Sequence, residues 1–296
     1  MSRRNFVYAI GLTTSSYHAS SLALVGVTIS LCFGAIAQEW SLRSSDGPED
    51  RHSHAVTYDS TRGRVVLVGG SATECPACTW EWDGSAAIWK ASGNEVSPSP
   101  RNSHGMAYNA LLDRVVLFGG NASANDTWEW DGATWMQLAT GSQPPGRDSH
   151  AMAYDSVRSR VVLFGGRGPS LLDDTWEWTG GGWIFRPVAG PSPRYATAMA
   201  YDSDRGVAVL FGGFGDGQYL DDTWEWNGNQ WSFCEAPGPG GRYFHSMAHD
   251  SSSGRVVLYD GSGAQGYLRD TWTWDGHAWS PVSTTGPAAR DRSSLA

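Results

Sequence analysis

The sequence predicts an all-β protein built from repeated four-stranded antiparallel units. Three observations support this fold class. The 296 residues include 37 Gly and 16 Trp, a composition typical of many short strands joined by tight turns. The Trp residues recur at a fixed interval along the chain. Within each interval, turn residues separate four runs of strand length.

The Trp residues form five triplets in register. The first member of each triplet lies 48 residues after the previous one, at Trp80, Trp128, Trp176, Trp224 and Trp272. A second Trp follows two residues later, and a third opens the next run, at positions 89, 135, 183, 231 and 279. Trp40 fits this third position as a lone earlier copy. Because every Trp has a repeat position, these residues are predicted to be structural.

The third unit shows the first two strands clearly. Residues 147–154 alternate between polar and apolar side chains, as in a half-buried strand. A polar turn follows. It begins with Asp155, a residue type that favours turns because its side chain can bond the backbone of the turn. Residues 160–164 are mostly apolar and predict a strand buried on both faces. This strand ends at Gly165 and Gly166, where the missing Cβ permits positive φ and a close backbone neighbour.

The last two strands of the unit form a predicted hairpin. A loop that differs in every unit leads into residues 175–178, which place both Trp on one face and Glu177 on the other. Residues 179–182 form the turn, which reads Asp-Gly or Asn-Gly in the other units. Trp183 opens the fourth strand.

A four-stranded unit repeated at about 50 residues is typical of a propeller blade. The chain resembles the kelch-repeat family in its double glycines, in the Trp of the last strand, and in the Arg-x-x-His that opens four units. The resemblance implies a kelch-type β-propeller with five complete units plus partial terminal strands. The predicted units are residues 51–92, 101–138, 147–186, 194–234 and 242–282. Two positions depart from the family pattern: Asp260 replaces one glycine, and Trp stands in place of the usual Tyr before the hairpin turn.

The number of blades stays open. Residues 290–296 match the first half of a sixth opening strand, and Trp40 matches a lone fourth strand. A shared terminal blade made from these pieces would lack its two middle strands. The resemblance implies six or seven blades, so we expect either a five-bladed ring or a chain truncated within its sixth blade.

Residues 1–37 are predicted to be a signal peptide, and residues 38–296 the propeller. Arg3 and Arg4 precede an uncharged run over residues 21–37, which ends in the small-x-small pattern Ala35-Ile36-Ala37. Cleavage is expected before Gln38, by the general or the twin-arginine route. The propeller would then be secreted or periplasmic, with no membrane span once the signal is removed. The alternative is an uncleaved signal that anchors the protein in a membrane.

Charge and motifs exclude several functions. The formal net charge is −9, which disfavours binding to a phosphate backbone, so no nucleic-acid partner is expected. No nucleophile elbow, phosphate loop or metalloprotease motif is found in the sequence. We expect no cofactor and no catalytic residue.

The loops predict a binding face. In each blade the loop between the second and third strands lies on the same face as the connection to the next blade, and these segments differ in every unit. Variation on one face of a repeated scaffold is typical of a binding surface. Units four and five place aromatic side chains there, where they can anchor a peptide or stack on a sugar ring. The candidate ligand-binding residues are Arg194, Tyr195, Phe214, Tyr219, Arg242, Tyr243, Phe244 and Tyr267.

Other repeated or paired residues have two interpretations each. The opening Arg of each unit either reaches a ligand at the channel mouth or bonds carbonyls and Asp of the scaffold. The four His at equivalent positions, His54, His104, His150 and His245, either hold a metal or make contacts between blades, and we expect no metal. Cys75 and Cys78 are predicted to form a disulfide across a turn rather than a redox pair.

The predicted function is an exported, non-catalytic module that binds a protein or a glycan on the variable loops. The alternative is a carbohydrate-active propeller enzyme. The resemblance implies two such types, sialic-acid mutarotases and, with less support in the residues, galactose oxidases. The sequence does not decide whether the chain is an enzyme, because fold alone does not fix function.

Overall fold

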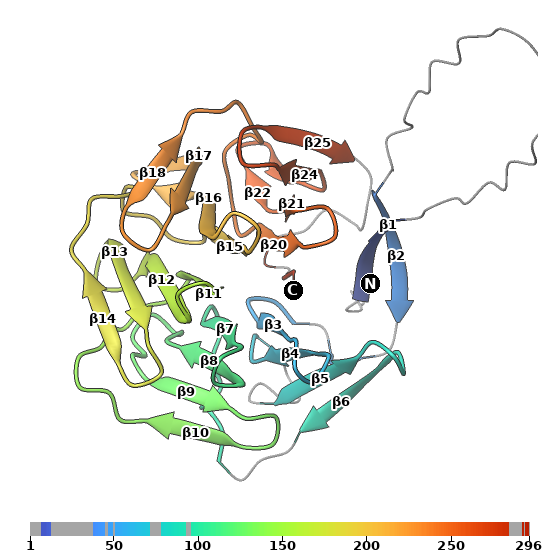
Figure 1. Ribbon diagram of the computed structural model, residues 1–296, viewed down its shortest axis with the longest axis vertical. Helices are drawn as coiled ribbons and strands as arrows, with labels where there is room; N and C mark the ends of the chain where they lie inside the picture. Colours follow the sequence, from blue (N-terminus) through green and yellow to red (C-terminus); the bar gives the residue numbers. More distant parts are fainter. Residues whose placement is uncertain are drawn as a thin grey trace, which may run out of the picture.

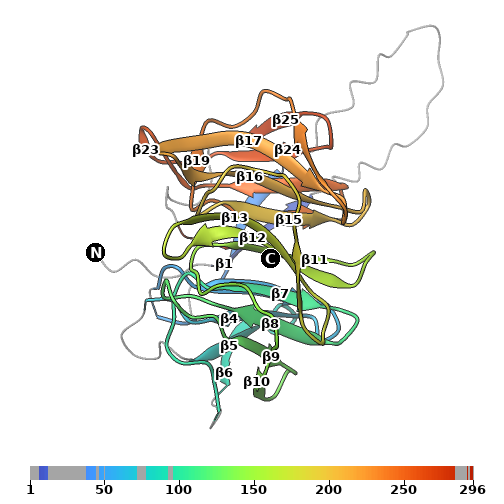
Figure 2. The ribbon, with the colours of Figure 1, turned by 90° about the vertical axis from the view of Figure 1, so that its left-hand side faces the viewer.

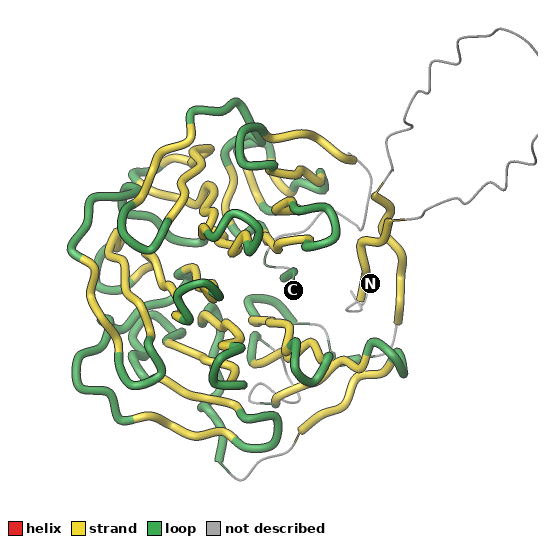
Figure 3. The backbone as a smooth tube through the Cα atoms, viewed as in Figure 1, coloured by secondary structure: helices red, strands yellow, loops and turns green. Residues whose placement is uncertain are grey.

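The computed structural model describes residues 7–12, 38–44, 47–49, 51–71, 78–92, 96–283, 292 and 294–295. Five four-stranded antiparallel sheets are arranged around a central axis (Figures 1 and 3). Every element that the structure describes is a strand, bridge or loop. Accordingly, no helix in the described part of the chain has the length and apolar character needed to cross a membrane. The all-β propeller with five complete units is thereby confirmed.

The sheets follow the predicted units in order. Blade one contains β3 (Ala55–Asp59), β4 (Arg64–Val68), β5 (Thr79–Asp83) and β6 (Ile88–Ser92). Blade two contains β7 (Gly105–Asn109), β8 (Arg114–Phe118), β9 (Thr127–Trp130) and β10 (Trp135–Leu138). Blade three contains β11 (Ala151–Asp155), β12 (Arg160–Arg167), β13 (Leu171–Trp178) and β14 (Trp183–Arg186). Blade four contains β15 (Ala198–Asp202), β16 (Val207–Gly215), β17 (Gln218–Trp226) and β18 (Trp231–Cys234).

Blade five adds a small second sheet. Its four main strands are β20 (Ser246–Asp250), β21 (Arg255–Tyr259), β24 (Thr271–Trp274) and β25 (Trp279–Ser283). A three-stranded sheet joins β19 (Arg242–Tyr243), β22 (Ser262–Gly263) and β23 (Gly266–Tyr267). Figure 2 shows this small sheet at one side of the ring.

The core lies between neighbouring blades. Most apolar residues of the second strands are buried, as the sequence predicts for strands covered on both faces, and Val161 to Phe164 of β12 have no exposed surface. One cluster joins Val116 and Phe118 of blade two to Leu163 and Trp178 of blade three. The innermost strands β3, β7, β11, β15 and β20 contact one another in that order. Blades two to four therefore bury their faces against two neighbouring blades, whereas blades one and five each pack against one.

The repeated Trp side chains hold adjacent blades together. In blades two to five, the Trp that opens the fourth strand donates its Nε1 proton to a buried Thr hydroxyl of the preceding blade, as Trp183 does to Thr127 at 2.9 Å. The same bond joins Trp135 to Thr79, Trp231 to Thr175, and Trp279 to Thr223. These contacts confirm the structural interpretation of the Trp pattern.

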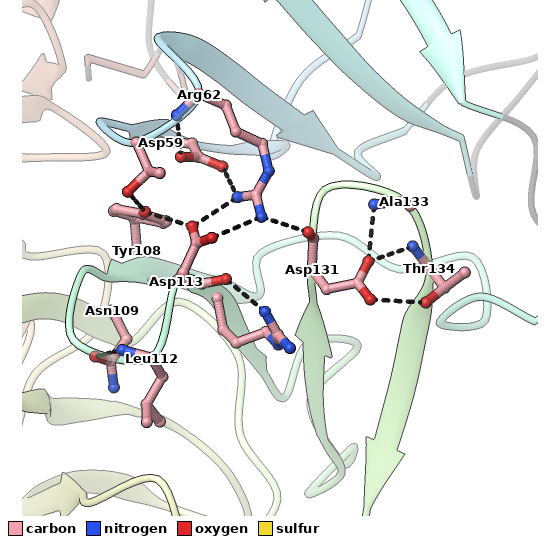
Figure 4. A network of polar contacts seen from close by, with 11 residues as sticks. Asp59, Arg62, Tyr108, Asn109, Leu112, Asp113, Asp131, Ala133 and Thr134 are labelled. Atoms are coloured by element: carbon pink, nitrogen blue, oxygen red, sulfur yellow. Dashed lines mark hydrogen bonds and ion pairs between the residues drawn. The ribbon is translucent and has the colours of Figure 1, made fainter.

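The face with the short turns is bridged by Arg side chains (Figure 4). Arg62, on the turn after β3, forms hydrogen bonds with Asp59 of its own turn and with Asp113 and the carbonyl of Asp131 in blade two. Arg158 similarly contacts Asp155 and the carbonyl of Gly206 in blade four. This face is therefore a set of fixed connections between blades.

The gap between blades five and one holds the terminal strands. β1 (Val7–Leu12) pairs with β2 (Gln38–Ser44) in an antiparallel sheet that Figure 1 places between β25 and β6. β1 falls within the predicted signal peptide, so this pairing and cleavage before Gln38 cannot both exist in one mature molecule. Most of residues 1–37 and of the partial unit 290–296 lie outside the described residues.

Arg292 occupies a position around the channel that is equivalent to one residue in each of the five blades. The backbone of one residue per unit forms a chain of hydrogen bonds from blade to blade, through Ser53, Ser103, Ser149, Ala196 and Phe244. Arg292 N continues it by donating to Phe244 O at 2.9 Å, and all six residues have positive φ near 55°. Ser294 Oγ donates to His54 O at 3.4 Å. The last described residues thus connect blade five to blade one.

Candidate functional site

The variable-loop face carries a compact aromatic cluster, which we define as Tyr195, Phe214, Tyr219, Tyr243 and Phe244. The backbone brings its members together. β16 and β17 extend past their Gly212-Gly213 corner as a long hairpin, which carries Phe214 and Tyr219 opposite each other. Tyr195 N donates to Phe214 O at 3.1 Å, and Phe214 N donates to Tyr195 O at 2.9 Å. β19 of the next blade supplies Tyr243.

The double glycines allow this extension. Gly213 has φ of 103°, and a Cβ there would lie 3.0 Å from the carbonyl oxygen of Tyr195. A larger residue would therefore push the hairpin away from the strand that presents Tyr195.

The rings of the cluster pack edge to face or at a tilt. The centroid of Phe214 lies 5.2 Å from that of Tyr219 and 5.9 Å from that of Tyr195. Tyr243 lies 5.5 Å from Tyr219 and 4.7 Å from Phe244. These are the separations at which aromatic pairs attract each other. The five rings form a continuous apolar surface that spans blades four and five.

Two guanidinium groups border the cluster. Arg167 places its Cζ 5.2 Å from the ring centre of Tyr195, and its side chain is 52% exposed. Arg292 lies 4.4 Å from the ring centre of Phe244. Neither arginine was predicted from the sequence as a binding residue. The one available signal was position: Arg167 directly follows a double glycine, as Phe214 does in the next unit.

Tyr267 lies apart from the cluster. It sits on β23, pairs with Ser262, and is 57% exposed. No ring contact joins it to the five clustered side chains among the interactions of the described residues. It is therefore an isolated surface aromatic and a useful control position.

The candidate Arg194 and Arg242 are bound within the scaffold. The guanidinium of Arg194 donates to both oxygens of Asp222, at 2.5 and 2.8 Å, and to the carbonyl of Gly212 at 3.1 Å. Arg242 makes the same bonds to Asp270 and Asp260 O. Both arginines are about 98% buried or more. Their donors are occupied by the fold, so we leave these two residues out of the binding surface.

The first blade departs from this arrangement. Cys78 stands where the other units have the paired Asp. Arg51 keeps the carbonyl of Gly69, but its Nη2 makes no hydrogen bond to any described residue. Trp80 Nε1, whose equivalents donate to that Asp, also has no acceptor in the described structure. Cys78 is disulfide-bonded, whereas Cys75 lies outside the described residues, so their pairing stays a prediction.

The four repeated histidines line the central channel. They border a cavity of about 150 Å³ together with Ser103, Ser149 and Arg292. Burial, with the positive charge of the neighbouring Arg, lowers the pKa of His104 and His245 to about 3 and that of His54 to about 4. Their rings are therefore neutral at pH 7. No three of them bring ring nitrogens within 4.8 Å of one another in the described structure, which disfavours a shared metal.

The fold and the variable-loop face define a β-propeller interaction module. A family model described as the KLHDC2/KLHL20/DRC7 Kelch-repeats domain matches residues 26–179. This match spans more than half of the 296 residues, so the chain belongs to the kelch-repeat family. No curated protein matches the sequence. Family and fold together make the chain a protein-interaction propeller.

Proposed function

We propose that the protein binds a partner protein by inserting one of the partner's apolar or aromatic side chains against the aromatic cluster. The observation that carries this proposal is the packing of five aromatic rings from two blades into one surface on the variable-loop face. Interface hot spots are enriched in such side chains. Arg167 lies at the border, where it can pair with a carboxylate of the same partner.

The packing of the rings favours a protein over a glycan. A sugar stacks on a free ring face, but here the rings contact one another, and Tyr219, the most exposed of the five residues, is 37% exposed. An apolar side chain needs no free flat ring and gains from contact with several ring edges at once.

A phage library of linear peptides, selected on the immobilised protein, tests this proposal. We expect enriched peptides to share an aromatic or aliphatic anchor. Tyr219→Ala should weaken binding of a selected peptide at least tenfold, or about 1.4 kcal/mol, whereas Tyr267→Ala should leave it unchanged. Equal loss in both variants would contradict the proposal. A glycan array run in parallel would replace it if Tyr219-dependent sugar binding appeared, and sugar turnover would favour the enzyme alternative.

We also propose that the protein is exported. Support comes from the N-terminal Arg pair, the uncharged run and the Ala35-Ile36-Ala37 motif. The mass of the protein purified from the extracellular or periplasmic fraction should correspond to a chain that begins at Gln38. Recovery of the full chain from membranes would instead indicate an uncleaved anchor.

A further inference from the structure

His249 occupies a position at which the other four units have Tyr, namely Tyr58, Tyr108, Tyr154 and Tyr201. In blades three and four this Tyr reaches across the short-turn face to the preceding blade. Tyr154 accepts a hydrogen bond from Leu111 N, and Tyr201 accepts one from Val157 N. His249 of blade five reaches the corresponding turn of blade four, so an imidazole replaces a phenol at this contact.

The imidazole meets two carboxylates there. His249 Nε2 lies 3.4 Å from Asp202 Oδ1 and 3.8 Å from Asp204 Oδ2. One ligand atom from each of the three residues lies within 4.8 Å of the others. The His249 side chain is 8% exposed, and its Nε2 makes no hydrogen bond in the described structure. A buried nitrogen that makes no hydrogen bond in the described structure therefore faces two acidic oxygens.

The spacing fits a small divalent ion. Two ligands that lie about 2.1 Å from a tetrahedral zinc are about 3.4 Å from each other, close to both nitrogen–oxygen distances. His249 Nδ1 lies 3.3 Å from Ser203 Oγ, which can accept the Nδ1 proton when Nε2 binds a metal. Such a second contact is usual for metal-binding histidines. Asp204 is 55% exposed, which gives an ion access and leaves room for water.

The surrounding charges also favour a cation. Asp202 is held in place because Oδ1 accepts from the backbone of Asp204 and Arg205, and Oδ2 accepts from Arg205 Nε at 2.7 Å. Arg205 also pairs with Glu225 at 2.6 Å. Asp202, Asp204 and Glu225 thus bring three negative charges to this contact between blades, against the one positive charge of Arg205.

We propose that Asp202, Asp204 and His249 form a binding site for a divalent transition metal, with zinc the preferred ion, that joins blades four and five on the short-turn face. Mixed nitrogen and oxygen ligands suit zinc and its neighbours better than magnesium or calcium, which prefer oxygen alone. The site lies on the face opposite the aromatic cluster, so it is independent of the proposed protein partner.

Titration of the EDTA-treated, dialysed full chain with zinc chloride, followed by calorimetry and thermal melting, tests the site. Wild-type protein should bind one zinc equivalent at this site and gain Tm on binding. His249→Tyr restores the residue of the other units and should fold normally. It and Asp204→Asn should each lose at least tenfold in zinc affinity. His277→Ala, which removes an exposed histidine of the same blade, should bind as wild type.

Two results would overturn the proposal: no zinc binding by wild-type protein, or equal binding by His249→Tyr. Melting in EDTA separates these results from misfolding, since His249→Tyr should then match wild type. Magnesium and calcium serve as further probes. Affinity for either ion equal to that for zinc would contradict a ligand role for the imidazole.

Discussion

At the scale of single residues, the opening arginines show how a repeated charge serves the fold. Arg147 has no exposed surface and forms a two-point contact with Asp174, at 2.5 and 2.8 Å, which also accepts Trp176 Nε1. A buried guanidinium needs such a partner, because its desolvation is otherwise uncompensated. The Arg position therefore recurs for structural reasons, whatever the ligand.

Asp174→Ala should lower the free energy of unfolding by about 3–5 kcal/mol, since it leaves Arg147 buried without its carboxylate. Urea unfolding measures the loss. Asp173→Ala is the matched control, because Asp173 is adjacent and exposed. A similar, small effect of both substitutions would show that the ion pair contributes little.

The channel histidines make the stability depend on pH. Burial, together with the charge of Arg147, lowers the pKa of His150 well below its usual value of 6.5, as it does for the other three. The folded state then resists protonation that the unfolded chain accepts. The stability that these histidines contribute is therefore fully present above pH 6.5. It falls as the pH drops below 6.5, by about 1.4 kcal/mol per pH unit for each histidine. Burial raises the pKa of Glu129, so the folded state holds this proton more tightly than the unfolded chain does. The effect of Glu129 on the pH dependence of stability is therefore opposite to that of the histidines.

His150→Thr, which copies the natural Thr197 of blade four, should reduce the number of protons taken up on unfolding by about one. The slope of unfolding free energy against pH should fall accordingly. Unfolding free energies measured from pH 7 to pH 5 report the slope directly. An unchanged slope would place His150 in contact with solvent and contradict its burial.

At the scale of elements, the stability of a strand depends on the interface between its own blade and the neighbouring blade. Trp178 of β13 is 1% exposed, packs with Trp183 at 5.5 Å, and donates to Glu129 of blade two at 3.3 Å. The third strand of one blade thus completes the core of the blade before it.

Trp178→Ala should cost about 3–5 kcal/mol of unfolding free energy, a large part of the roughly 5–15 kcal/mol available to a domain. Phe185→Ala, on the neighbouring outer strand, is the control because Phe185 is 49% exposed. Thermal melting that is unchanged in Trp178→Ala would place this side chain outside the interface between blades.

The strands could be predicted from the sequence because their signals are local. Period-two alternation, double glycines and Asp-Gly turns act within a few residues, and they defined all five blades. Contacts such as Trp183 with Thr127 join residues 56 positions apart, and depend on how neighbouring blades meet. All five residues of the aromatic cluster were among the candidates predicted from the sequence. Tyr267 was predicted with them but lies apart on β23, and Arg167, which borders the cluster over Tyr195, was not predicted.

At the scale of the whole molecule, the two faces of the ring carry different sets of residues. The variable-loop face presents the aromatic cluster, whereas the short-turn face carries bridging arginines such as Arg158 and Arg62. Because the two sets of residues share no partners, their effects should be additive.

Arg158→Ala should lower unfolding free energy by about 1–2 kcal/mol, because it leaves Asp155 and the carbonyl of Gly206 without this donor, and should leave peptide affinity unchanged. Tyr219→Ala should do the reverse, with peptide affinity reduced and Tm preserved. Melting curves and calorimetric titration with the same selected peptide check both. Coupled loss of affinity and stability in both variants would show that the faces are not independent.

The interfaces between blades also have a direction. In every Trp-to-Thr bond, the later blade supplies the donor and the earlier blade the acceptor, as in Trp231 to Thr175 and Trp279 to Thr223. On the ribosome, each acceptor is synthesised before the Trp that will find it. Folding can therefore proceed from the N-terminal blade to the C-terminal blade, because each folded blade offers the acceptors against which the next blade packs.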